Sequence, residues 1–100
     1  MTSTQLLDVR LARIVMRDSS DRQYIYLEEL GVETPRGFPI VIGTQEADEI
    51  YRVVHQIEPQ RPLTHMLAFK AIGALDAKVV GVDIVALQHN TFFARIELER

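Results

Sequence analysis

Residues 38–47 read Phe-Pro-Ile-Val-Ile-Gly-Thr-Gln-Glu-Ala, and the hydrophobic pattern changes its period within this stretch. The first five of these residues are typical of a short strand. Beyond Gly43, apolar residues recur at helical spacing, and Thr44 is the expected N-cap. The stretch therefore predicts a strand that leads directly into a helix, whose apolar positions are Ala47, Ile50, Tyr51 and Val54.

Two further strands are predicted upstream of this junction. In residues 7–16 the alternation of apolar side chains slips by one position, which predicts a bulge near Ala12 and Arg13 that keeps both apolar sets on one face. Residues 24–27 are typical of the second strand, and turn-forming residues separate the strands at 18–21 and 34–37.

Downstream, Pro59 and Pro62 bracket a connection to a second amphipathic helix that begins near Leu63 or Thr64, and Lys78 opens a final pair of strands. The predicted order is three strands, two helices and two strands, which makes residues 1–100 a single α+β domain with both helices on one sheet face. We expect a shared core formed by Ile50, Val54, Leu67, Ala71, Ile84, Ile96 and Leu98.

The last two strands can be aligned in two ways. A three-residue loop at 89–91 sets Ile84 opposite Ile96, whereas a two-residue loop sets Ile84 opposite Arg95. We favour the first alignment because it keeps one face apolar across both strands. An apolar strand edge of this kind invites pairing with a second copy, so we also expect a homodimer. The residues that form this apolar face on the last strand are Phe92, Ala94, Ile96 and Leu98.

Composition limits the classes of function. With 47% hydrophobic and 25% charged residues, the chain is typical of a soluble globular domain. The absence of cysteine excludes disulfide scaffolds and cysteine-ligated zinc, and a net charge of -3 argues against a protein that coats nucleic acid electrostatically. No apolar run reaches the roughly 18 residues that span a bilayer, so we expect a cytoplasmic protein without a membrane partner.

Two segments carry candidate chemistry. Glu46 could present a carboxylate at the strand-to-helix junction, or it could stabilise the helix dipole by about 0.3 to 1 kcal/mol. Arg61, Thr64 and His65 gather at the start of the second helix, where unpaired N–H groups favour an anion such as phosphate. His65 could also act as a general acid or base there. Alternatively, Thr64 caps the helix and Arg61 pairs with a surface acid.

A third candidate site lies on the final hairpin. The favoured alignment places Asp83 opposite Glu97, and two adjacent carboxylates are what a hard divalent cation requires. Arg95 on the same face offers the alternative of a charge cluster. The sequence contains no Walker loop, nucleophile elbow, dinucleotide fingerprint or HExxH motif.

Taken together, these features resemble the bifunctional nuclease (BFN) domain family of bacteria and plants. The resemblance implies an α+β fold on a mixed sheet and an ability to cleave DNA and RNA. It covers nearly the whole chain, in residues 38–43, in Glu46 and Ala47 with Ile50, in residues 61–65 with Leu67, and in residues 82–84 and 91–96.

For a nuclease, the candidate residues have distinct roles. Arg61 and Thr64 would hold a phosphate, and Glu46 or His65 would activate water or protonate the leaving oxygen. A divalent metal is a candidate cofactor. Family members usually continue past the final strand into an Asp-Ala-Arg-Pro-Ser-Asp-Ala type motif, whereas this chain stops at Arg100. The alternative function is therefore a non-catalytic binding or oligomerisation module of the same fold.

Overall fold

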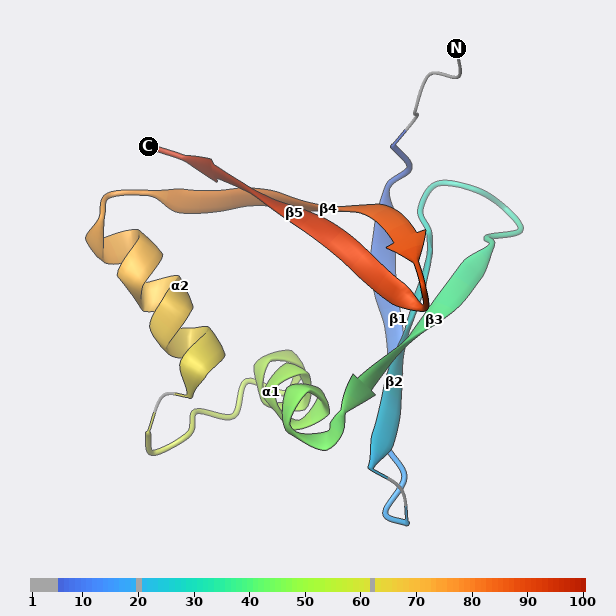
Figure 1. Ribbon diagram of the computed structural model, residues 1–100, viewed down its shortest axis with the longest axis horizontal. Coiled ribbons are helices and arrows are strands. Elements are labelled where there is room, and N and C mark those ends of the chain that lie inside the picture. Colours follow the sequence, from blue (N-terminus) through green and yellow to red (C-terminus); the bar gives the residue numbers. More distant parts are fainter. Residues whose placement is uncertain (1–5, 20, 62) are drawn as a thin grey trace. The chain divides into compact units, whose positions relative to one another are not determined.

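The computed structural model describes residues 6–19, 21–61 and 63–100, and it divides into two compact units between Glu58 and Pro59 (Figure 1). The element order is three strands, two helices and two strands, which confirms the α+β class. The strands form two separate antiparallel sheets, in place of the mixed sheet that was expected. Each paired strand follows its neighbour after a short connection, and short connections favour antiparallel pairing.

The first unit is a three-stranded sheet followed by a helix. Its strands are β1 (Val9–Val15), the central β2 (Arg22–Glu29) and β3 (Gly37–Gly43), and α1 (Thr44–Val54) follows β3 directly. The predicted junction of strand and helix is confirmed. Ala47 of α1 is fully buried, as expected for the apolar side of this helix.

The N-cap of α1 is Gly43, so the prediction of Thr44 as the cap is wrong. Thr44 is the first helical residue, and its hydroxyl oxygen accepts a hydrogen bond from Nε2 of Gln23 at 3.4 Å. The side chain is therefore directed to β2, and no side-chain hydrogen bond caps the helix.

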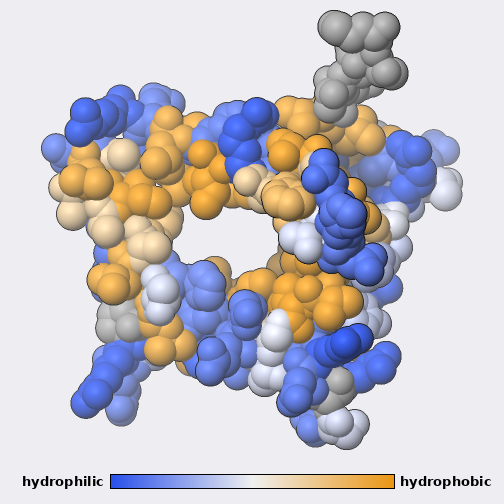
Figure 2. Space-filling model, viewed as in Figure 1, coloured by the Kyte–Doolittle hydropathy of each residue, from blue (hydrophilic) through white to orange (hydrophobic). Residues whose placement is uncertain are grey.

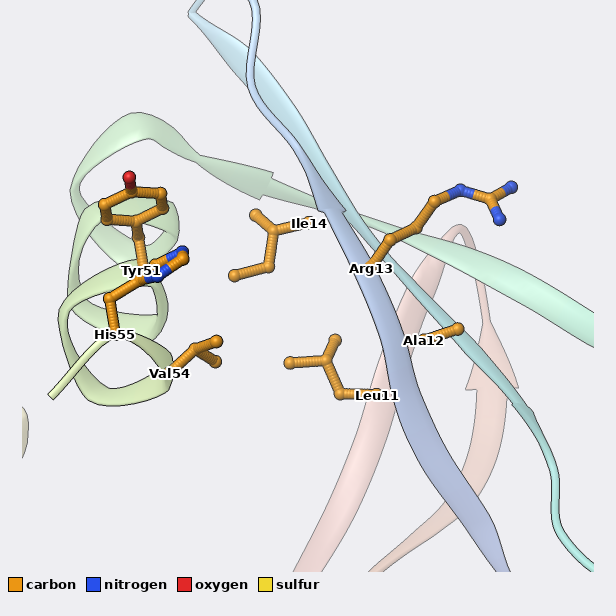
Figure 3. Close-up of a pocket in the computed structure, with 7 residues that line it drawn as sticks. All are labelled: Leu11, Ala12, Arg13, Ile14, Tyr51, Val54 and His55. Atoms are coloured by element: carbon orange, nitrogen blue, oxygen red, sulfur yellow. The ribbon is translucent and has the colours of Figure 1, made fainter.

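The predicted bulge in β1 is confirmed. Leu11 pairs with Leu27 and Arg13 pairs with Tyr26, which leaves Ala12 as the extra residue. Figure 3 shows the consequence, because Leu11 on one side of the bulge and Ile14 on the other both point toward α1. A single inserted residue thus restores a continuous apolar face across a strand whose sequence changes phase.

The second unit contains α2 (Thr64–Ala74), β4 (Lys78–Gln88) and β5 (Thr91–Glu99). Lys78 opens the hairpin as predicted. The helix differs from the expected amphipathic one, because its apolar residues lie on all sides and it has no buried residue. A helix that is apolar all round is normally covered by other parts of a protein.

The alignment predicted for β4 and β5 is wrong. Gln88 pairs with Thr91, so the loop contains only His89 and Asn90, both with positive φ as in a type I′ turn. The register shifts twice along β4, at Val80 and at Val85. These two bulges keep one face apolar with the shorter loop, which a ladder without bulges cannot do.

Pairing across the hairpin gives two contrasting faces. We call one the apolar hairpin face; its cross-strand pairs are Val79 with Leu98, Val82 with Ile96, Ile84 with Ala94, and Leu87 with Phe92. The other face carries the charged residues of β5. Figure 2 shows orange, hydrophobic surface over parts of both units.

The expected shared core is mostly wrong. Ile50 and Ile84 are half-buried, and the other five expected core residues are exposed. A helix and a two-stranded ribbon offer too little surface to enclose each other's apolar side chains. Among the described residues, no helix is long and apolar enough to cross a membrane. The exposed members of the expected core are Val54, Leu67, Ala71, Ile96 and Leu98.

Candidate functional site

Glu46 lies in the first turn of α1 and is exposed. Its side chain folds back over the N-cap, so that Oε2 lies 2.9 Å from where a Cβ on Gly43 would be. An acid three residues after the N-cap interacts favourably with the helix N-terminus, and glycine at 43 leaves room for this arrangement. The geometry therefore agrees with the dipole interpretation of Glu46, and its catalytic role stays a prediction.

Gln23 fixes the start of this helix relative to the sheet. Its side chain is buried, with 3% of the residue exposed, and Nε2 donates hydrogen bonds to Thr44 Oγ1 and, at 3.0 Å, to the Arg17 carbonyl oxygen. The Arg17 backbone N–H donates to Oε1 of Gln23. One amide thus ties the β1–β2 turn to the turn of helix that carries Glu46. Sequence reasoning missed it, since no periodicity marks a buried glutamine.

The other candidate residues lie in the second unit at the start of α2. Thr64 is the first helical residue, His65 is the second, and Leu63 is the N-cap without a side-chain capping bond. The alternative in which Thr64 caps the helix is therefore wrong. Arg61, Thr64 and His65 are exposed, and Pro62 lies outside the described residues. These three side chains share one chain segment, and their approach to Glu46 in the first unit stays a prediction.

The hairpin pairs Asp83 with Arg95, and Glu97 with Gly81. Asp83 Oδ2 accepts a hydrogen bond from Nη2 of Arg95 at 3.0 Å, and Nε of Arg95 lies 3.9 Å from Glu97 Oε1. The two carboxylates are thus linked through a guanidinium, as in the charge-cluster alternative. Within the described part of the chain, no group of three or more His, Asp or Glu residues could hold a metal ion.

A cavity of about 220 Å³ lies between β1 and α1 (Figure 3). Tyr51 and His55 stand one helical turn apart at its edge, with ring centroids separated by 4.1 Å. No role was predicted for His55, although spacing by four residues on a helix is the signal that would have found this pair. The cavity is smaller than the roughly 300 Å³ of typical ligand sites, so we interpret it as a packing gap. Its lining residues are Leu11, Ala12, Arg13, Ile14, Tyr51, Val54 and His55.

The family to which this chain belongs follows from comparison with known protein families. Residues 25–100 match the model of the bifunctional nuclease domain. The chain belongs to the bifunctional nuclease domain family. Two uncharacterized proteins of Mycobacterium tuberculosis, from strains CDC 1551 and H37Rv, are each 36% identical to it over 93 residues. The alignment covers 93% of this chain and 56% of each relative, so the chain spans about half the length of these proteins.

The match to the bifunctional nuclease domain begins within β2. It includes Glu46, the segment 61–65 and the charged face of the hairpin, whereas β1 with its bulge precedes it. All the residues predicted to act on a phosphodiester therefore lie within the part of the chain that defines the family.

Proposed function

We propose that this bifunctional nuclease domain hydrolyses phosphodiester bonds of DNA and RNA. Membership in the family carries the proposal, because the match spans every candidate residue. The first turn of α2 supports it chemically, since exposed N–H groups at a helix N-terminus favour a phosphate. Arg61 would add a bidentate contact to the same group, and the Thr64 hydroxyl would donate a further hydrogen bond.

In this mechanism, Glu46 or His65 transfers the proton. One of them activates water, or protonates the oxygen that leaves when the P–O bond breaks. Asp83 and Glu97 both interact with Arg95, and among the described residues no group of three or more His, Asp or Glu could hold a metal ion. We therefore assign no step to a resident metal. A cytoplasmic location stays part of the proposal, since a chain without cysteine does not depend on an oxidising compartment.

The proposal is tested by incubation of the domain with plasmid DNA and total RNA, with and without EDTA. We expect His65→Gln or Glu46→Gln to lower cleavage by about a hundredfold or more, the usual contribution of a general acid or base. Matched controls are His55→Gln and Glu33→Gln, which remove an exposed imidazole and an exposed carboxylate elsewhere in the chain. Cleavage that survives in both test variants would indicate a contaminating nuclease.

The apolar hairpin face favours a second candidate function, oligomerisation. Val82 and Ile96 form one of its central pairs and are 59% and 60% exposed. Exposed apolar patches of this kind mark interaction sites, and a two-fold dimer needs only one self-complementary patch. We therefore propose a homodimer in which two such faces pack together, with or without nuclease activity.

Sedimentation at micromolar concentration tests this candidate. Ile96→Lys places a charge in the apolar hairpin face and should give a monomer, whereas Glu97→Lys places a lysine on the opposite face and should keep the dimer although it changes the net charge more. A wild-type protein that sediments as a monomer would refute it.

A further inference from the structure

The sheet of the first unit has a face that is turned away from α1. Figure 3 shows the Arg13 side chain on the side of β1 opposite to Leu11 and Ile14. Arg13 pairs with Tyr26, and side chains on one strand alternate between faces, so the same face can be followed across the sheet. We call it the outer face; its charged and aromatic residues are Arg10, Arg13, Arg22, Tyr24, Tyr26 and Glu28.

Charge is segregated onto this face. Residues 6–58 contain six arginines against ten carboxylates, so the first unit is acidic as a whole. Three of those arginines lie on the outer face, together with two carboxylates: Glu28, and Glu46, which folds over Gly43 opposite Arg22. Glu28 is engaged by Arg10, with 2.6 Å between Nη2 and Oε1. The outer face is therefore a local basic surface on an acidic unit, and such a surface attracts a polyanion.

Two tyrosines on the central strand give this surface aromatic character. Tyr24 and Tyr26 lie two residues apart on β2 and are both half-buried. The guanidinium carbon of Arg13 lies 4.3 Å from the centroid of the Tyr26 ring. On β3, Gly37 is so close to this ring that an added Cβ would lie 2.5 Å from Tyr26 Cε1. A cation–π contact with the Tyr26 ring therefore holds the planar guanidinium of Arg13 over the sheet.

We propose that the outer face binds single-stranded nucleic acid. Bases stack on Tyr24 and on the guanidinium plane of Arg13, while the phosphates are attracted by the arginines of the flanking positions. A duplex does not fit this chemistry, because its bases are already stacked on one another. The inference rests on the proposed nuclease function and adds the substrate class, a single strand held by the sheet while cleavage takes place elsewhere.

Binding is measured without turnover, in EDTA, by the fluorescence anisotropy of labelled twelve-nucleotide oligo(U) and oligo(dT) and of a duplex of equal length. We expect both single strands to bind at least about fivefold more tightly than the duplex. A difference between oligo(U) and oligo(dT) would show whether the 2′-hydroxyl contributes, because only RNA carries it. Equal or tighter binding of the duplex would overturn the proposal.

Substitutions localise the binding. Arg13→Gln should weaken single-strand binding by about tenfold, because it removes both the planar group on which a base stacks and a positive charge of the outer face. The matched control is Arg36→Gln, which removes the same charge from an exposed arginine of the same unit, outside the outer face, and should change binding less than twofold. Equal losses in the two variants would mean that only net charge matters, and the outer face would not be the site.

The aromatic contribution has its own pair of variants. Tyr24→Leu should weaken binding by about fivefold or more, whereas Tyr24→Phe retains the ring and should bind as the wild type does. Circular dichroism checks that each variant keeps its fold. Loss of binding in both variants, with the fold intact, would exclude stacking at Tyr24.

Cleavage and single-strand binding, both measured in the wild type and in Arg13→Gln, separate this inference from the proposed function. If cleavage is absent from the wild type while binding depends on Arg13, the nuclease proposal fails and the binding surface stands. If cleavage occurs while Arg13→Gln binds normally, the reverse holds.

Discussion

The two units cover apolar surface to different extents. In the first unit, α1 follows the three-stranded sheet directly and packs on it, which buries Ala47 and leaves Gln23 only 3% exposed. In the second unit, neither α2 nor β5 contains a buried residue, and one face of the hairpin is apolar throughout. Three strands and one amphipathic helix can form a small core, whereas two strands cannot without a further partner. Substitutions in the first unit should therefore cost more stability than matched substitutions in the second.

The largest difference in stability between the two units is expected when a glutamine of each is replaced. Gln23→Ala removes the amide that bonds both backbone groups of Arg17 and the Thr44 hydroxyl, and should lower the free energy of unfolding by about 2 to 3 kcal/mol. Gln88→Ala alters an exposed side chain at the end of β4 and should change it by less than about 0.5 kcal/mol. Urea denaturation of both variants measures the difference, and equal losses would contradict the comparison.

Replacement of a glycine in each unit should give the next largest difference in stability. At Gly37 a Cβ would lie 2.5 Å from the Tyr26 ring and 2.7 Å from the Leu27 carbonyl oxygen, neither of which can move freely. Gly37→Ala should therefore destabilise the first unit by about 1 to 2 kcal/mol. At Gly81 the nearest atom is Glu97 Oε2 at 3.8 Å, so Gly81→Ala should be neutral or slightly stabilising. Thermal unfolding of the two variants tests this order; a greater loss at Gly81 would reverse it.

The same contrast explains which predictions from sequence are confirmed. The bulge at Ala12 and the junction at Gly43 follow from hydrophobic periodicity within one unit, where neighbouring strands and the helix share a face. The hairpin alignment fails because two bulges, at Val80 and Val85, restore the apolar face with a shorter loop, and a strict alternation of residues cannot reveal them. The expected core fails because burial depends on what covers a face, which local patterns do not encode.

The features of the candidate site also differ in how far the sequence predicts them. Local features such as the helix starts at Thr44 and Thr64 follow from the sequence to within one residue. The tertiary partners do not, because Gln23 reaches Thr44 over 21 positions and Arg95 reaches Asp83 through a shifted register. The basic outer face is hidden in the sequence, since its arginines come from two strands and its tyrosines from one.

A smaller effect is expected for an ion pair that closes the loop between β2 and β3. Hydrogen bonds from the Arg36 side chain, and then from its backbone N–H, hold the pKa of Glu29 below its ordinary value of 4.5. A carboxylate with a lowered pKa in the folded state stabilises the fold above pH 4.5, and this contribution is lost as the pH falls through the folded-state value. The Glu29→Gln variant should therefore lose less stability than the wild type when the pH falls below about 4.5.

Urea midpoints measured between about pH 7 and pH 3 test this expectation. Glu33→Gln, a change of the same kind within the loop between β2 and β3, serves as the control and should keep the acid dependence of the wild type. An unchanged acid dependence in Glu29→Gln would show that the Arg36 pair does not contribute.

The smallest effect should be equal in the two units, because it concerns helix ends that are alike. After α1, the Gln56 N–H donates a hydrogen bond to the Val53 carbonyl oxygen at 3.2 Å, and the Ile57 N–H donates one to the Arg52 carbonyl oxygen at 2.9 Å. After α2, Asp76 occupies the position that Gln56 occupies after α1. Both residues have positive φ, 56° and 60°, where glycine is normally preferred.

Gln56→Gly and Asp76→Gly should each stabilise the protein by at most about 1 kcal/mol, since removal of Cβ relieves the left-handed conformation but increases the entropy of the unfolded chain. Similar gains in both variants, read from urea midpoints, would show that the two helices end equally well. The weakness of the second unit would then lie in its uncovered faces rather than in its local structure. A gain at Gln56 alone would instead show that the end of α2 contributes little to the transition, as expected if the second unit loosens before the first unfolds.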